Sequence, residues 1–300
     1  MSLYEFLGTV EVGLIFSLVA LGAFITFRIL DFPDLTVEGS FPLGAAVAAV
    51  LIVNFGSNPW AATLVAAMAG FGVGFTTAFL NVRFNILHIL AGILVSISLY
   101  SVNLRVMSGP NKPLLGAHTI FSAVQGWGVP AYILSPLLLL VIVATIKLLL
   151  DLFLSTGVGM NMRAAGANPA MAAANGVNVG RMKLVGLGMA NALTALAGAI
   201  FAQSFGAADA YMGIGVIIIG LAAVIVGMSL LPARTIAQAT LACLFGAMLY
   251  RFAVAFSLNA DFLGLKASDV QLVTAILVVV TLVGQSSRSG MGKLLKRKSS

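Results

Sequence analysis

Charged residues are scarce in this chain of 300 residues, where Asp, Glu, Lys and Arg together make up only 8% of the sequence. A soluble domain carries roughly 25% charged residues, so burial in a water-soluble core cannot account for so few. Apolar runs such as 137–150 and 270–283 also lack the polar face that defines an amphipathic soluble helix. The composition therefore predicts an all-α polytopic membrane protein and excludes an ordinary soluble domain.

Residues that carry catalysis or bind metals are also few, with one cysteine and two histidines. The single Cys243 excludes a disulfide within the chain and a zinc site built on cysteine. His88 lies in an apolar segment and His118 in a long loop, and no Ser/Asp constellation surrounds either. For His88 we favour a packed or pore-facing histidine over a ligand. The sequence thus predicts no catalytic centre, no metal site and no cofactor bound by this chain.

Two further sequence signals are missing. The chain has no GxxxxGK[ST] pattern, so we do not expect it to hydrolyse ATP by that device. Its first residues, MSLYEFLGTVEVG, lack a basic region, so we expect no cleavable signal peptide. The formal net charge is +7, which we attribute to basic loops on one side of a membrane rather than to nucleic-acid binding.

Nine apolar segments are candidates for membrane spans, since one simple crossing needs about 20 residues. They cover residues 7–27, 42–57, 60–81, 86–104, 131–152, 182–203, 213–230, 235–256 and 268–284. The second and seventh segments are short, so each is a candidate for a broken or re-entrant segment. We expect one transmembrane domain over residues 1–284, followed by a basic cytoplasmic tail over 285–300.

The distribution of Lys and Arg predicts the orientation. With the C-terminus in the cytoplasm and nine crossings, the N-terminus lies outside. This arrangement places 12 of the 16 Lys and Arg residues on the cytoplasmic side and the remaining four outside. The basic run over 293–298 would then contact anionic headgroups of the inner leaflet. The longest outer loop, over about 105–130, is rich in Pro and Gly, and we expect turns and one short helix there.

A small polar segment over 159–180 interrupts the apolar chain and has the pattern of a short, well-capped helix. Asn168 is a favourable N-cap, and Pro169 follows at the first helical position, where its missing N–H has no cost. Gly176 can adopt the left-handed conformation that ends a helix. A helix of about seven residues is not stable alone, so this one needs a partner surface.

Three carboxylates lie between the first two spans, at Asp31, Asp34 and Glu38. A charge at membrane depth costs roughly 2.5–3.5 kcal/mol on insertion scales, so such residues usually face protein or a water-filled cavity. The alternative is a solvated loop. Glu11, in the first span, is a further candidate of the same kind.

Residues 162–176, followed by Arg181 and Lys183, resemble the cytoplasmic signature of bacterial ABC-importer permeases of the branched-chain amino acid and ribose type. The matching signature residues are Arg163, Ala164, Gly166, Asn168, Pro169, Ala172, Ala173 and Gly176. The glycine pattern of 198–227 is similar to the same family. Segments 30–46 and 90–115 resemble a subgroup linked to uptake of aromatic or other amino acids.

This resemblance implies a complete transporter in the bacterial inner membrane. Its parts are two permease subunits forming a homodimer, two cytoplasmic subunits that bind ATP and Mg, and an external solute-binding protein or lipoprotein. The polar segment over 157–180 would be the coupling segment that inserts into the ATPase. The expected coupling residues are Arg163, Gly166, Asn168, Pro169, Ala172, Ala173 and Gly176. The expected residues bordering the solute pathway are Asp31, Asp34, Glu38, Phe41, Asn103 and Arg105.

Two other classes of function remain open at this point. An ion-coupled secondary transporter would use intramembrane ionisable residues as a relay and would show inverted repeats. Glu11 and the three carboxylates are the only material for such a relay, and no clear repeat is visible. A membrane enzyme is disfavoured because a catalytic constellation is missing. The interpretation we favour is an ATP-driven permease for a small solute, most simply an amino acid.

Overall fold

A computed structural model describes residues 3–122, 130–258, 276 and 279. Within these residues, seven helices are long and apolar enough to cross a membrane. They are α1 (Leu3–Ala23) with its π-helical continuation η1 (Phe24–Ile29), α2 (Val37–Phe55), α3 (Pro59–Phe84), α4 (His88–Met107), α5 (Ala131–Ser155), α8 (Val179–Phe205) and α10 (Ile236–Leu258). The prediction of an all-α polytopic membrane protein is confirmed.

Eight of the nine predicted segments coincide with helices: the seven long helices match seven of them, and the shorter α9 (Val216–Leu230) matches the segment 213–230. At 15 residues, α9 spans about 22 Å, which is shorter than a hydrocarbon core of roughly 30 Å. The described residues thus contain seven full-length helices and the shorter α9, and the predicted total of nine segments remains a prediction. The ninth segment, 268–284, and the tail, 285–300, lie outside the described residues apart from Ile276 and Val279.

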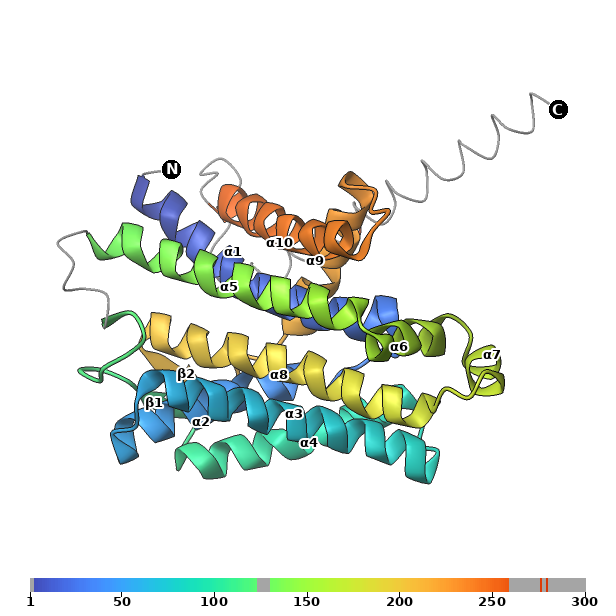
Figure 1. The fold of residues 1–300 in the computed structure, drawn as a ribbon. Helices are drawn as coiled ribbons and strands as arrows, with labels where there is room; N and C mark the ends of the chain where they lie inside the picture. The colour runs from blue at the N-terminus through green and yellow to red at the C-terminus, as the bar shows by residue number, and fades with distance from the viewer. Residues whose placement is uncertain (1–2, 123–129, 259–275, 277–278, 280–300) are drawn as a thin grey trace.

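The two ends of the helical bundle carry different small elements (Figure 1). At one end, β1 (Asn111–Pro113) pairs antiparallel with β2 (Ala207–Asp209), with Lys112 opposite Ala208. This pair ties the loop after α4 to the loop after α8. At the other end, the short helices α6 (Gly157–Ala167) and α7 (Pro169–Ala174) connect α5 to α8. We call these the strand end and the α7 end.

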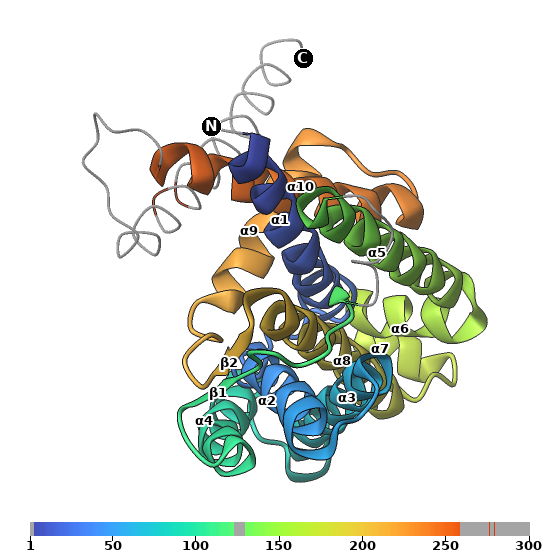
Figure 2. The same cartoon turned by 90° about the vertical axis from the view of Figure 1, so that its left-hand side faces the viewer.

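Helix α8 lies in the centre of the bundle, between α1 on one side and α2 and α3 on the other (Figure 2). Small residues make this packing close: a Cβ on Gly44 of α2 would lie only 1.9 Å from the carbonyl oxygen of Ala195. In a membrane, such close backbone approach replaces the hydrophobic driving force between helices. Helices α4 and α5 lie at the periphery and expose many apolar side chains.

Helices α2 and α9 both begin inside the bundle rather than at one of its ends. A Cβ on Gly39, in the first turn of α2, would lie 3.2 Å from the Cα of Ser96. Since α4 begins at His88, Ser96 is about 12 Å along that helix. Gly213, just before α9, packs against the carbonyl oxygen of Glu38 in turn. The starts of these two helices therefore meet part-way along α4. The start of α9 lies in the predicted seventh segment, whereas α2 begins at Val37, five residues before the predicted second segment.

Candidate functional site

Helix α7 is short but has hydrogen-bonded caps at both ends. Asn168 Oδ1 accepts a 3.0 Å hydrogen bond from the backbone N–H of Met171, and Pro169 occupies the first helical position. At the other end, Gly176 has φ of 82° and donates to the carbonyl of Ala173, while Val177 donates to that of Ala172. This pair of bonds is a Schellman motif. The capped helix predicted from the sequence is confirmed, with Ala174 as its last residue.

Helix α6 was not predicted, because three glycines in 11 residues disfavour a helix. Two local features compensate. Thr156 caps its first turn by accepting from the N–H of Gly159. Gly166 packs so closely on the end of η1 that a Cβ there would lie 1.8 Å from the carbonyl oxygen of Ile29. The Thr156 cap is the signal in the sequence that could have revealed this helix.

The predicted coupling segment presents a surface at the α7 end of the molecule. In Figure 1, α7 projects beyond the neighbouring long helices. Of its predicted coupling residues, Ala172 is buried, whereas Arg163 and Ala173 are exposed. Met171 is also 65% exposed. A projecting helix with small and flexible apolar side chains suits insertion into a groove on another protein.

A cleft of about 530 Å³ lies beside this surface, between η1, α6 and the connection from α9 to α10. Arg28, Arg163 and Arg234 line it, together with Asp31. Three guanidinium groups against one carboxylate make the cleft strongly cationic. It is therefore suited to acidic groups rather than to a neutral solute.

The three carboxylates between the first two spans are close in sequence, but the structure separates them. Asp31 is exposed at the cationic cleft, Asp34 is fully buried, and Glu38 is half-buried in the first turn of α2. The prediction treated them as one cluster, and the fold assigns them to three different environments. The physical reason is the irregular stretch of chain between η1 and α2, which leads from the cationic cleft at Asp31 through the bundle interior at Asp34 to the start of α2.

Asp34 belongs to a buried polar network that connects four parts of the chain. Asn191 Nδ2 donates to Asp34 Oδ2 over 2.7 Å, and Ser40 Oγ donates to Asn191 Oδ1 over 2.7 Å. Thr36 N–H donates to Asp34 Oδ1 over 2.9 Å, and the hydroxyl of Thr36 bonds that of Thr77. Burial raises the pKa of Asp34, and the hydrogen bonds from Thr36 and Asn191 only partly oppose that effect.

Glu38 and Asn103 come together at a pocket of about 250 Å³ between α2, α4 and the segment before α9. Glu38 Oε1 accepts a 3.1 Å hydrogen bond from the N–H of Gly215, the N-cap of α9. Asn103 is fully buried, and its Nδ2 donates to the carbonyl of Gly39 over 3.3 Å. Tyr100 and Tyr211 also line this pocket, and the sequence alone did not single them out.

The remaining two predicted pathway residues lie apart from this pocket. Phe41 is fully buried and stacks on Phe16, with ring centroids 5.8 Å apart. Arg105 is exposed in the last turn of α4, beyond Asn103 toward the strand end. Neither residue lines the pocket that contains Glu38. Among the described residues, no cluster of His, Cys, Asp and Glu is placed to hold a metal ion.

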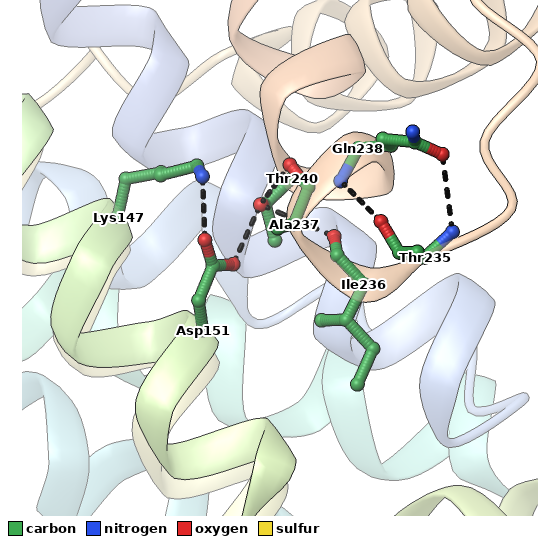
Figure 3. A network of polar contacts seen from close by, with 7 residues as sticks. All are labelled: Lys147, Asp151, Thr235, Ile236, Ala237, Gln238 and Thr240. Carbon is green, nitrogen blue, oxygen red and sulfur yellow. Dashed lines mark hydrogen bonds and ion pairs between the residues drawn. The ribbon is translucent and has the colours of Figure 1, made fainter.

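Apart from the Asp34 network and the Glu38 pocket, a polar contact joins α5 to α10 near the α7 end (Figure 3). Lys147 Nζ lies 2.5 Å from Asp151 Oδ2, one helical turn further along α5. Thr240 of α10 donates to Asp151 Oδ1 over 2.6 Å. Both charged side chains are only 13% exposed. At the opposite end of the bundle, Ser204 of α8 donates to Glu11 of α1. These contacts hold helices together and lie away from the pocket.

Comparison with protein families gives this architecture an identity. Residues 6–285 match the family described as the permease component of the branched-chain amino acid transport system. The chain belongs to this family. The match covers α6, α7, the pocket and the long helices apart from the first three residues of α1. It confirms the resemblance to ABC-importer permeases that the sequence showed.

Two relatives align with this permease over most of its length. A tyrosine transport system permease protein of Clostridioides difficile (strain R20291) is 39% identical over 271 residues, covering 90% of this chain and 88% of its own. An uncharacterized protein of Rickettsia prowazekii (strain Madrid E) is 32% identical over 278 residues, covering 91% of this chain and 94% of its own. No solved structure matches the permease.

Proposed function

We propose that this permease forms the membrane channel of an ATP-driven amino-acid importer in the bacterial inner membrane. It acts as a homodimer with two cytoplasmic ATPase subunits, which bind ATP and Mg, and with an external solute-binding protein. The observation that carries the proposal is the capped, projecting α7 within the permease signature. A six-residue helix has little stability of its own. Its caps at both ends preserve its shape for contact with a docking partner.

The orientation follows from this role. The α7 end, with Arg163 and the cationic cleft, faces the cytoplasm, and the strand end faces the binding protein. The N-terminus of α1 then lies outside, in agreement with the distribution of basic residues. ATP-driven closure of the ATPase pair moves α7, and α6 transmits the movement through the Gly166–Ile29 contact to η1. The irregular chain between η1 and α2 continues from there to the pocket at Glu38.

The choice of an amino acid as solute rests on the family and on the tyrosine transport relative. The pocket at Glu38 contains polar and aromatic side chains suited to such a molecule. The external binding protein supplies the first selection of solute. The permease opens a pathway for it by alternating access, and ATP hydrolysis takes place in the partner subunits.

Reconstitution tests this proposal. The permease, its ATPase and its binding protein are placed in liposomes, and uptake of labelled L-tyrosine is measured with and without ATP. We expect uptake to require ATP and all three components. Uptake by the permease alone, driven by a proton or sodium gradient, would instead support the secondary transporter, for which buried Asp34 would be the relay candidate.

Variants in the coupling segment test its role separately. Arg163→Glu, and Asn168→Ala combined with Pro169→Ala, should lower solute-stimulated ATPase activity while leaving membrane insertion intact. Arg83→Glu is the matched control, because Arg83 is exposed at the same end of the molecule but lies outside α6 and α7. Wild-type stimulation in the Arg163→Glu complex would rule out the coupling role.

A further inference from the structure

The pocket between α2, α4 and the start of α9 has a polar atom left without a partner. Asn103 is fully buried, yet its Oδ1 has no hydrogen-bond partner among the described residues. Its Nδ2 must face the carbonyl oxygen of Gly39, because a carbonyl accepts only from a donor. The unpartnered atom of this pocket-lining residue is therefore an acceptor. A buried acceptor without a donor is costly, and at a pocket wall it marks a place for a ligand N–H.

The second polar group of the pocket is also an acceptor. Glu38 holds its carboxylate against the backbone N–H of Gly215, the N-cap of α9, where the positive end of the helix dipole stabilises a negative charge. This contact uses Oε1 and leaves Oε2 for a further donor. The described residues that line the pocket include no Lys, Arg or His. A negatively charged, acceptor-rich wall without a cation is complementary to an ammonium group.

Aromatic rings form the outer wall of the same pocket. Tyr100 of α4 and Tyr211 lie with ring centroids 5.6 Å apart, and their hydroxyls are 2.7 Å from each other. Both rings are partly exposed, at 38% and 55%. Paired rings of this kind favour an aromatic partner by stacking or edge contacts, and their faces also attract a cation.

The position of the pocket suits a transported molecule. Ser96 and Asn103 lie about 12 Å and 23 Å from the start of α4, so the pocket is at the middle to strand-end half of the membrane. The starts of two helices that begin inside the bundle, α2 and the short α9, converge there. Helix termini that lie near the bilayer midplane form the solute sites of many transporters.

We propose that this pocket binds an aromatic amino acid during transport, with the α-ammonium group held by Glu38 and Asn103 Oδ1 and the side chain against Tyr100 and Tyr211. The proposal deepens the proposed function, on which it rests for the identity of the solute. A volume of about 250 Å³ accommodates the ammonium group and an aromatic side chain. Glu38 and Asn103 thus favour an aromatic ligand that carries an ammonium group over an aromatic carboxylic acid that lacks one.

Cysteine protection tests the pocket without depending on ATP or on the binding protein. Ile214→Cys places a thiol on the exposed rim of the pocket, and the native Cys243 is fully buried, so maleimide labels one site. In the nucleotide-free permease–ATPase complex, L-tyrosine and tyramine should each slow labelling at least threefold. 3-(4-Hydroxyphenyl)propanoate lacks the ammonium group and should not. Equal protection by all three probes, or by none, would overturn the proposal.

Substitutions identify the groups responsible. Glu38→Gln retains an oxygen for Gly215 and removes only the charge, so it should weaken protection by tyramine about tenfold. Tyr211→Leu should weaken protection by L-tyrosine. Glu5→Gln is the control, since Glu5 is exposed at the far end of α1. If tyramine protects the Glu38→Gln variant as well as it protects the wild-type pocket, the proposed ammonium site is wrong. If wild-type uptake fails in liposomes while protection persists, the transport role fails and the pocket stands.

Discussion

The side chains of Asn191 and Asp34 form a 2.7 Å hydrogen bond in which both partners are fully buried. The amide of Asn191 donates to Asp34 and also accepts from Ser40, so one side chain of α8 fixes both the chain before α2 and the first turns of α2. Asn191 is therefore the point where the central helix holds the α1–α2 connection.

Stability should depend on pH through Asp34. Burial raises the pKa of Asp34 in the folded state above its unfolded value, so the folded state favours the neutral form. The stabilising contribution is complete below the unfolded pKa, near 3.9, and is lost as pH rises through the raised folded pKa. Thermal unfolding in detergent should show this decline, and Asp34→Asn should make it shallower. An unchanged pH profile in the variant would contradict this assignment.

The hydroxyl pair between Thr36 and Thr77 offers a matched comparison on one helix. Thr77→Val removes a buried 2.9 Å hydrogen bond and leaves the Thr36 hydroxyl without that partner, so we expect a loss of about 1 kcal/mol in unfolding free energy. Thr76→Val is the control, because the Thr76 side chain is exposed and bonds only the carbonyl of Gly72. Chemical denaturation of both variants in detergent measures the difference. Equal losses would mean that the Thr36 contact contributes little.

The contact between Gly166 and Ile29 should be sensitive to one methyl group. Gly166→Ala would place a Cβ 1.8 Å from the Ile29 carbonyl oxygen, which forces α6 away from η1. We expect solute-stimulated ATPase activity to fall severalfold while assembly with the ATPase is retained. Gly157→Ala lies on the same helix in open space and should behave as wild type. If the two variants behave alike, α6 does not transmit movement through this contact.

Removing one partner of the Lys147–Asp151 pair should lower the unfolding free energy more than replacing both partners by apolar residues. Lys147→Met leaves a largely buried carboxylate without its cation, so we expect a loss of about 3 kcal/mol or more in unfolding free energy. Lys147→Met combined with Asp151→Leu removes both charges and should recover most of that loss. Thermal melts of the two variants in detergent provide the measurement. A double variant no more stable than the single one would show that packing of the pair, rather than its charge, is what matters.

Local capping could be predicted because it depends on neighbouring residues. Asn168, Pro169 and Gly176 determine the start and end of α7 through their own hydrogen bonds and backbone preferences. Helix α6 escaped prediction because its glycines oppose a helix locally, and the close contact of Gly166 with Ile29, distant in sequence, supports it. The approximate positions of the long helices followed from apolar length, which the membrane imposes directly.

The sequence by itself determined that this chain crosses a membrane, where most of its helices lie, and where a short capped helix interrupts the apolar chain. Each of these depends on composition or on residues within a few positions of one another. Only the tertiary structure decided that Asp31, Asp34 and Glu38 have separate environments and that Asn103, Tyr100 and Tyr211 share a pocket with Glu38. The reason is that α2 and α9 begin inside the bundle, and the depth of a helix start depends on packing between residues far apart in the chain.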